Sequence, residues 1–195
     1  MVLKKPLDRY SPVKKERNSM TNEEIHHKYA MLKQLSSLPR KMVSIHGADK
    51  VADLVLHELC QPECFNLVKA AYFVDNPDFD CFKGVSGLYR GELNDNHSVS
   101  WHDHESFVAS TFDLPFNKKV REITKESYRR KNMRDQDMVE QIASDLGFGD
   151  HAFCSWDMKH ANHGLFIYEK AEFAACLIEE YLADGLSLLS FCPIN

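Results

Sequence analysis

The stretch Ala152–Tyr168, AFCSWDMKHANHGLFIY, carries the clearest secondary-structure pattern in the chain. Its first half alternates two sets of side chains, with Cys154 and Trp156 on the same side of an extended strand. Residues 160–164 have the composition of a turn, and the apolar run 165–168 follows directly. The stretch therefore predicts an antiparallel β-hairpin.

Two further regions upstream have the character of strands. Leu67–Val74 is apolar on both alternating faces and ends in the turn sequence 75–78, which predicts a strand buried on both sides, with a helix as the alternative. Residues 79–93 indicate a return strand or two short ones, whose three glycines are typical of bulges or tight turns. Residues 97–102 indicate another strand, so the sheet is expected to be antiparallel.

Helical spacing of apolar residues flanks these strands. Thr21 and Glu24 have the spacing of a capping box, and the apolar pattern that follows predicts a helix that stops before Pro39. The other predicted helices cover residues 49–59, a segment capped by Asn117, a segment around 138–146 that ends at Gly147, and residues 171–183 capped by Gly185.

These patterns predict the α+β class, with an antiparallel sheet of about four to six strands and helices before, between and after the strands. Residues 1–18 mix prolines with basic side chains without periodicity, and we expect a flexible basic arm there. Residues 19–195 are expected to form a single α+β domain.

The composition narrows the class of protein. A hydrophobic content of 44% is enough to form a core, which excludes disorder for most of the chain. The basic start has no apolar stretch behind it, and no run approaches the roughly 20 apolar residues of a membrane span. Six irregularly spaced cysteines are typical of reduced thiols, so we expect a cytoplasmic protein without a membrane span.

The ten histidines suggest one function. His102 and His104 would point to the same side of a continuing strand, while His160 and His163 flank the hairpin turn near Asp157. Imidazole and carboxylate groups are good ligands for divalent metals such as zinc. We therefore expect a small-ligand- or divalent-metal-binding protein whose site is lined by these five residues, with hydrolysis as a candidate reaction. Solvated surface histidines are the alternative, because the spacing matches no metalloprotease or zinc-ribbon motif.

A second group of possible ligands consists of His57, Cys60 and Cys64. The helical pattern places His57 and Cys60 on a polar face, and Pro62 interrupts the register before Cys64. We therefore expect an exposed histidine with one exposed and one buried thiol rather than a zinc site. The sequence assigns no catalytic residue.

Charge is concentrated in residues 118–134, which contain eight basic and two acidic side chains and so leave a net charge of −11 on the rest of the chain. The residues that would form one stripe of a helix are Lys118, Arg121, Lys125 and Arg129, with Tyr128 beside them. This predicts, as an alternative function, a non-catalytic regulatory or protein-interaction module that binds an acidic partner. Nucleic-acid binding is a second alternative, against which the acidic remainder argues. The stripe could also pair with the chain's own acidic surface.

Overall fold

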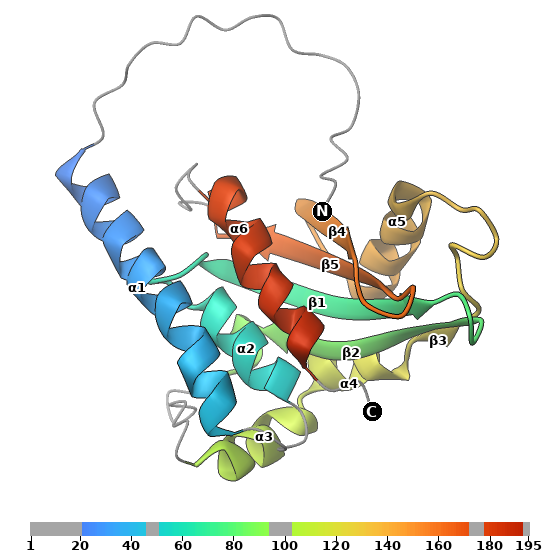
Figure 1. Ribbon diagram of the computed structural model, residues 1–195, viewed down its shortest axis with the longest axis horizontal. Helices are drawn as coiled ribbons and strands as arrows, with labels where there is room; N and C mark the ends of the chain where they lie inside the picture. The colour runs from blue at the N-terminus through green and yellow to red at the C-terminus, as the bar shows by residue number, and fades with distance from the viewer. Residues whose placement is uncertain (1–20, 46–50, 94–102, 172–177, 193–195) are drawn as a thin grey trace, which may run out of the picture.

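The computed structural model describes residues 21–45, 51–93, 103–171 and 178–192 (Figure 1). The elements in chain order are α1 (Asn22–Ser44), α2 (Val51–Cys60), β1 (Leu67–Asn76), β2 (Cys81–Tyr89), a short 3-10 helix (Arg90–Glu92), α3 (His104–Phe112), α4 (Pro115–Glu122), β3 (Thr124–Lys125), α5 (Asp135–Leu146), β4 (His151–Asp157), β5 (His163–Lys170), α6 (Ile178–Ser187) and a 3-10 helix (Leu188–Phe191). The predicted α+β class is confirmed, with helices before, between and after the strands of an antiparallel sheet.

The sheet has the strand order β3-β2-β1-β5-β4. Its central strand is β1, which is buried along most of its length, as its two apolar faces predict. The predicted hairpin is formed by β4 and β5, and it pairs Asp157 with His163. Because β5 also pairs with β1, His163 lies between Asp157 and Asp75 at one end of the sheet. The register of β1 and β2 shifts between Gly84 and Ser86, which places a bulge in this glycine-containing strand.

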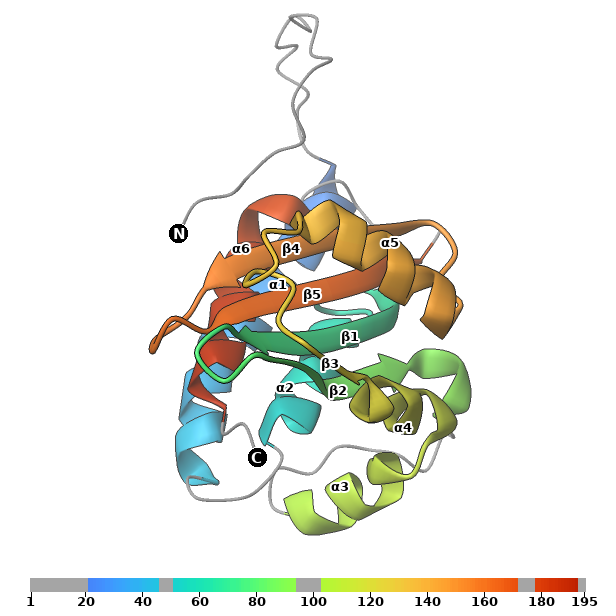
Figure 2. The same ribbon diagram turned by 90° about the vertical axis from the view of Figure 1, so that its right-hand side faces the viewer.

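Helices cover both faces of the sheet, as Figure 2 shows. Tyr72 and the helices α1, α2 and α6 contribute to the apolar cluster on one face. Phe73, which points to the opposite face, belongs to a second cluster with α4 and α5. No helix among the described residues is long and apolar enough to cross a membrane.

Helix α1 begins as the sequence predicts and ends later. The capping box of Thr21 and Glu24 is present. The prediction that the helix stops before Pro39 was wrong, since α1 continues to Ser44. Proline removes one backbone hydrogen bond, but buried apolar residues on both sides of it, Leu38 and Ile45, keep this segment against the body.

The polar face expected for α2 is not exposed. Asp53, His57 and Cys60 are all buried, because α2 lies between α1, α3 and the sheet. The polar groups have partners within the protein: Asp53 accepts hydrogen bonds from Ser86 and Arg121, and His57 contacts Gln61. These polar groups therefore bond to partners inside the protein rather than to solvent.

The predicted helix with an Asn117 cap was wrong at both ends. Leu114 is the N-cap residue and Pro115 is the first helical residue, while Asn117 is buried and bonds Gly87 and Thr111. The helix α4 ends at Glu122, and residues 124 and 125 form the short strand β3. The basic stripe expected from Lys118 to Arg129 is therefore not a continuous helical face.

The last helix does not end where the sequence predicts, since it continues to Ser187. Gly185 does not cap the last helix but lies inside α6, where it packs closely against Leu59 and Phe65. The predicted arm at 1–18, the strand at 97–102 and the start of the last helix at 172–177 lie outside the described residues. Of the apolar residues after Gly185, Leu186 and Leu189 are buried against the body, whereas Phe191 is exposed.

Candidate functional site

A polar cluster lies where β1 and β4 end and β5 begins, on the face of the sheet that α4 and α5 cover. Residues 123–134, which connect α4 to α5, lie over it and are called the cover segment below. Figure 2 shows this connection running from β3 past β1 and β5 to α5. The members of the cluster are Asp75, Ser127, Tyr128, Arg129, Asp135, Ser155, Asp157 and His163.

Asp75 is the most deeply placed charged group of the cluster, with no exposed surface. Its Oδ2 accepts hydrogen bonds from Ser127 Oγ at 3.0 Å and from the backbone N–H of Arg129 at 3.2 Å. Its Oδ1 is buried without a hydrogen-bond partner. Burial raises the pKa of Asp75 above its ordinary value, and the two hydrogen bonds offset this shift only in part. A buried carboxylate oxygen without a donor is uncommon and requires an explanation.

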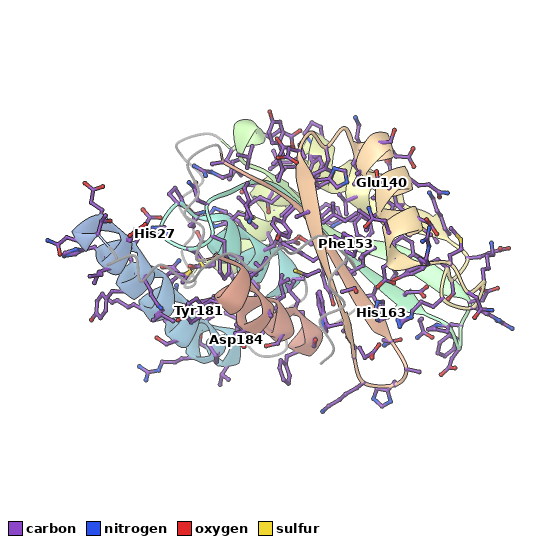
Figure 3. The ribbon with its side chains drawn as sticks, turned by 90° about the horizontal axis from the view of Figure 1, so that it is seen from above. His27, Glu140, Phe153, His163, Tyr181 and Asp184 are labelled. Carbon is purple, nitrogen blue, oxygen red and sulfur yellow. The ribbon has the colours of Figure 1, made fainter. Side chains whose placement is uncertain are left out.

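His163 lies beside Asp75 in the sheet and is also buried. Its Nδ1 lies 3.1 Å from Asp157 Oδ1 and 3.1 Å from Arg129 Nη1, and its Nε2 lies 3.6 Å from Asp135 Oδ1. Figure 3 labels His163 near the end of the β4–β5 hairpin. The imidazole thus contacts carboxylates of two elements, β4 and α5, and lies beside Asp75 of β1 in the sheet.

Asp135 begins α5 and connects the cover segment to β4. Its Oδ1 accepts a hydrogen bond from Tyr128 Oη at 3.0 Å, and its Oδ2 accepts one from Ser155 Oγ at 2.6 Å. Burial raises the pKa of Asp135, but the contacts with His163 and Ser155 outweigh it and hold this pKa below its ordinary value. Asp135 is therefore a stable anion that holds Tyr128 in place.

The cluster has an excess of negative charge. Three carboxylates, those of Asp75, Asp135 and Asp157, face one arginine, Arg129, and one histidine, His163. Arg129 forms its ion pair with the exposed carboxylate of Asp157, at 3.5 Å, while its backbone N–H contacts Asp75. The electrostatic field at this end of the sheet favours a cation.

The hydroxyl groups of the cluster are directed towards carboxylates. Ser127 donates to Asp75 and Ser155 donates to Asp135. Activation of a serine nucleophile requires the hydroxyl to donate to a base such as histidine, and these two serines donate elsewhere. The two serines therefore hold the carboxylates of Asp75 and Asp135 in position, which suits binding rather than nucleophilic catalysis.

Of the predicted metal-site residues that the structure describes, two are in contact and one lies in a different part of the fold. Asp157 and His163 lie together, and His160 is in the turn that joins their strands. His104 is not in a strand but is the first residue of α3, and Figures 1 and 2 place α3 beside α2 and α4, away from this turn. His102 lies outside the described residues. Within the described parts of the chain, no group of three or more His, Cys, Asp or Glu residues is arranged to hold a metal ion.

The second group of possible ligands is buried, contrary to the exposed histidine and exposed thiol expected from the sequence. Cys60 and Cys64 have no exposed surface, and His57 packs edge-on against Phe107. Burial raises the pKa of Cys64 and of Cys192 to about 12, and it raises that of Cys60 as well. These thiols remain protonated at neutral pH and behave as apolar side chains.

Many basic residues of segment 118–134 contact the chain's own carboxylates. Arg121 pairs with the buried Asp53 at 2.6 Å. The other pairs join Lys125 to Asp145, Arg129 to Asp157, Arg130 to Asp80, Lys131 to Glu126 and Arg134 to Asp137. Tyr128 is a buried residue of the cover segment, with its hydroxyl on Asp135, rather than a side chain beside a basic stripe.

The sequence pattern indicated Asp157 and His163 as metal ligands, and Tyr128 and Arg129 as part of a basic stripe, but it did not indicate the other members of the cluster. Asp75 directly follows the apolar run of β1, which signals a polar group at the end of a buried strand. Asp135 and Ser155 had no comparable signal, because their partners come from distant segments.

Comparison with known proteins found no matching family model, no similar curated protein and no similar solved structure.

Proposed function

We propose that the protein is a non-catalytic ligand-binding module that recognises a small organic cation through Asp75 and, by doing so, alters the position of the cover segment. The observation that carries this proposal is the buried Oδ1 of Asp75, which has no hydrogen-bond donor. A ligand N–H group that reached this oxygen would satisfy it and would add a charge-assisted hydrogen bond.

The charge of the cluster supports a cationic ligand. Arg129 and His163 balance the three carboxylates only in part, so a further positive charge lowers the electrostatic energy of the site. An ammonium or guanidinium group combines this charge with N–H donors. An anionic ligand would meet Asp75 and Asp135 unfavourably.

Ligand binding would be coupled to the cover segment through Asp75. The segment is mostly exposed, and its buried residues are Ser127 and Tyr128. Ser127 Oγ and the Arg129 N–H both bond the same carboxylate oxygen of Asp75. Because Asp75 has no exposed surface, a cation can reach Oδ1 only when the cover segment moves away, so binding shifts the segment towards a released state.

Isothermal titration calorimetry with agmatine and putrescine, against sodium chloride of equal ionic strength, tests the proposal. We expect saturable binding by the wild type, and a loss of about 10- to 100-fold in affinity for Asp75→Asn, because a hydrogen bond to a charged group contributes roughly 1.5–3 kcal/mol. The matched control is Asp145→Asn, which makes the same chemical change at an exposed ion pair with Lys125. Amide hydrogen exchange over residues 126–130 should become faster when the cation binds.

Two outcomes would contradict the proposal. One is the absence of saturable binding of either cation at millimolar concentrations. The other is stoichiometric zinc in the purified wild-type protein that is lost in His163→Ala, because that result would instead support the metal site predicted from the histidines.

A further inference from the structure

Helix α1 carries a second apolar stripe on its outer side. Four of its apolar side chains are exposed: Ile25 at 49%, Tyr29 at 71%, Leu32 at 39% and Val43 at 75%. With Ser36 and Pro39, they follow the alternating spacing of four and three residues that places side chains on one narrow line of a helix. This outer stripe is the pattern of a helix–helix seam, which is narrower than the apolar face of a helix that lies on a membrane.

The inner side of α1 already packs against the body of the protein. Met31 and Leu38 are buried against the body, and Leu35 and Met42 pack at the edge of the same cluster. The outer stripe therefore does not contribute to this core, and Figure 1 shows α1 at the margin of the molecule. An exposed row of apolar side chains of this kind, interrupted by Ser36, marks an interaction surface.

The two flanks of the outer stripe differ. On one flank α6 lies beside α1, with Lys28 Nζ 5.0 Å from the centre of the Tyr181 ring and Gly185 close to Leu35. Asp184 is exposed at the level between these two contacts, and Figure 3 labels it with Tyr181 on α6. An α-helix turns by about 100° per residue, which places Lys33 and Arg40 on the other flank of the outer stripe. Both side chains are exposed.

We propose that the outer stripe pairs with the same stripe of a second copy of this chain, in a parallel dimer whose two-fold axis runs along α1. Such a rotation places the Lys33 flank of each copy beside α6 of the other copy, at the level of Asp184. An antiparallel pair would instead bring the basic flanks of the two copies together, which is electrostatically unfavourable. Charge complementarity therefore favours a second copy of this chain as the partner, and it favours the parallel orientation of the two α1 helices.

Cysteine cross-linking of the full chain tests the direction of pairing. In a parallel dimer each stripe position faces its own copy, so Ile25→Cys and Val43→Cys should both form disulfide-linked dimers under mild oxidation. In an antiparallel dimer neither would, and only a position near the centre, such as Leu32→Cys, would cross-link. The controls are the wild type, which reports on the native cysteines, and Glu140→Cys on the exposed face of α5.

Sedimentation equilibrium tests the stripe and the charge pairing independently of cysteine. Leu32→Glu should raise the dimer dissociation constant by about tenfold or more, with unchanged circular dichroism. Lys33→Asp and Asp184→Lys should each raise it about threefold, because each removes two equivalent ion pairs per dimer, and the double variant should restore it. Two results would overturn the proposal: a wild-type protein that stays monomeric to high micromolar concentration, and a cross-link that forms only in Leu32→Cys. Either result would hold against the parallel dimer even if another protein, a lipid or the chain's own arm covers the stripe.

Discussion

At the residue scale, two aspartates in one cluster are shifted in opposite directions. Asp75 is buried with one oxygen unpartnered, and burial raises its pKa. Asp135 is also buried in part, but His163 and Ser155 outweigh the desolvation and lower its pKa. The complete burial of Asp75 and the stronger contacts of the partly exposed Asp135 together decide which carboxylate is stabilised as an anion.

This difference predicts opposite pH dependences for two conservative variants. A lowered pKa contributes stability that is present above the unfolded-state value of about 4 and is lost as the pH falls through the folded-state value. The advantage of the wild type over Asp135→Asn, roughly 1–3 kcal/mol at pH 7, should therefore shrink in acid. A raised pKa has the opposite sign, so the stability of the wild type relative to Asp75→Asn should increase as the pH falls towards about 4.

Urea unfolding of the three proteins between pH 3 and pH 8 measures both trends. Parallel stability curves for the wild type and Asp135→Asn would show that Asp135 is not selectively stabilised as an anion in the folded state.

At the scale of elements, the position of α4 on the sheet depends on glycines of β2. A Cβ atom at Gly84 would lie 1.8 Å from the backbone carbonyl oxygen of Val120, and one at Gly87 would lie 2.5 Å from the Val120 side chain. The Gly84 N–H also donates to the backbone oxygen of Ile123, which lies between α4 and β3, so the C-terminal end of α4 is held at the edge of β2. A backbone atom cannot move aside as a side chain can.

We expect Gly84→Ala to destabilise the protein by about 1–3 kcal/mol or more, because α4 must move away from β2. Gly149→Ala is the matched control, since a Cβ atom there meets neighbours no closer than 3.6 Å. Thermal unfolding by calorimetry compares the two variants, and equal midpoints would show that α4 does not rest on β2 at this point.

At the scale of the whole molecule, an ion pair joins the two helical layers around the edge of the sheet. Arg121 of α4 donates to Asp53 of α2, and Ser86 of β2 donates to the other carboxylate oxygen. Both charged groups are largely shielded from water, with side-chain exposures of 20% and 3%. Removing one partner from such a pair leaves the other charge buried alone.

Arg121→Met should therefore cost about 3–5 kcal/mol of stability, and combining it with Asp53→Asn should recover part of this loss. Arg130→Met provides the control, because its ion pair with Asp80 is exposed and such pairs contribute at most about 1 kcal/mol. The measurement is the urea midpoint at constant m-value. Similar losses of stability in Arg121→Met and Arg130→Met would argue against a stabilising buried ion pair between the two helical layers.

The sequence by itself determined the class of fold and several of its elements. Alternation in Ala152–Tyr168 identified the β4–β5 hairpin, the apolar run at Leu67 identified β1, and the cap at Thr21 located the start of α1. These features depend on neighbouring residues, so local periodicity and capping chemistry are sufficient to predict them. The end of α1 and the extent of α4 were not predictable in this way, because packing decided them.

Only the tertiary structure decided which polar groups act together. Asp75, Ser127, Asp135 and Ser155 come from four segments, and nothing in their local sequence pairs them. The same holds for the basic segment, whose Arg121 bonds an aspartate 68 residues away. The physical reason is that a charged group's burial and partners depend on strand register and on which elements pack together, and both are set by contacts distant in the chain.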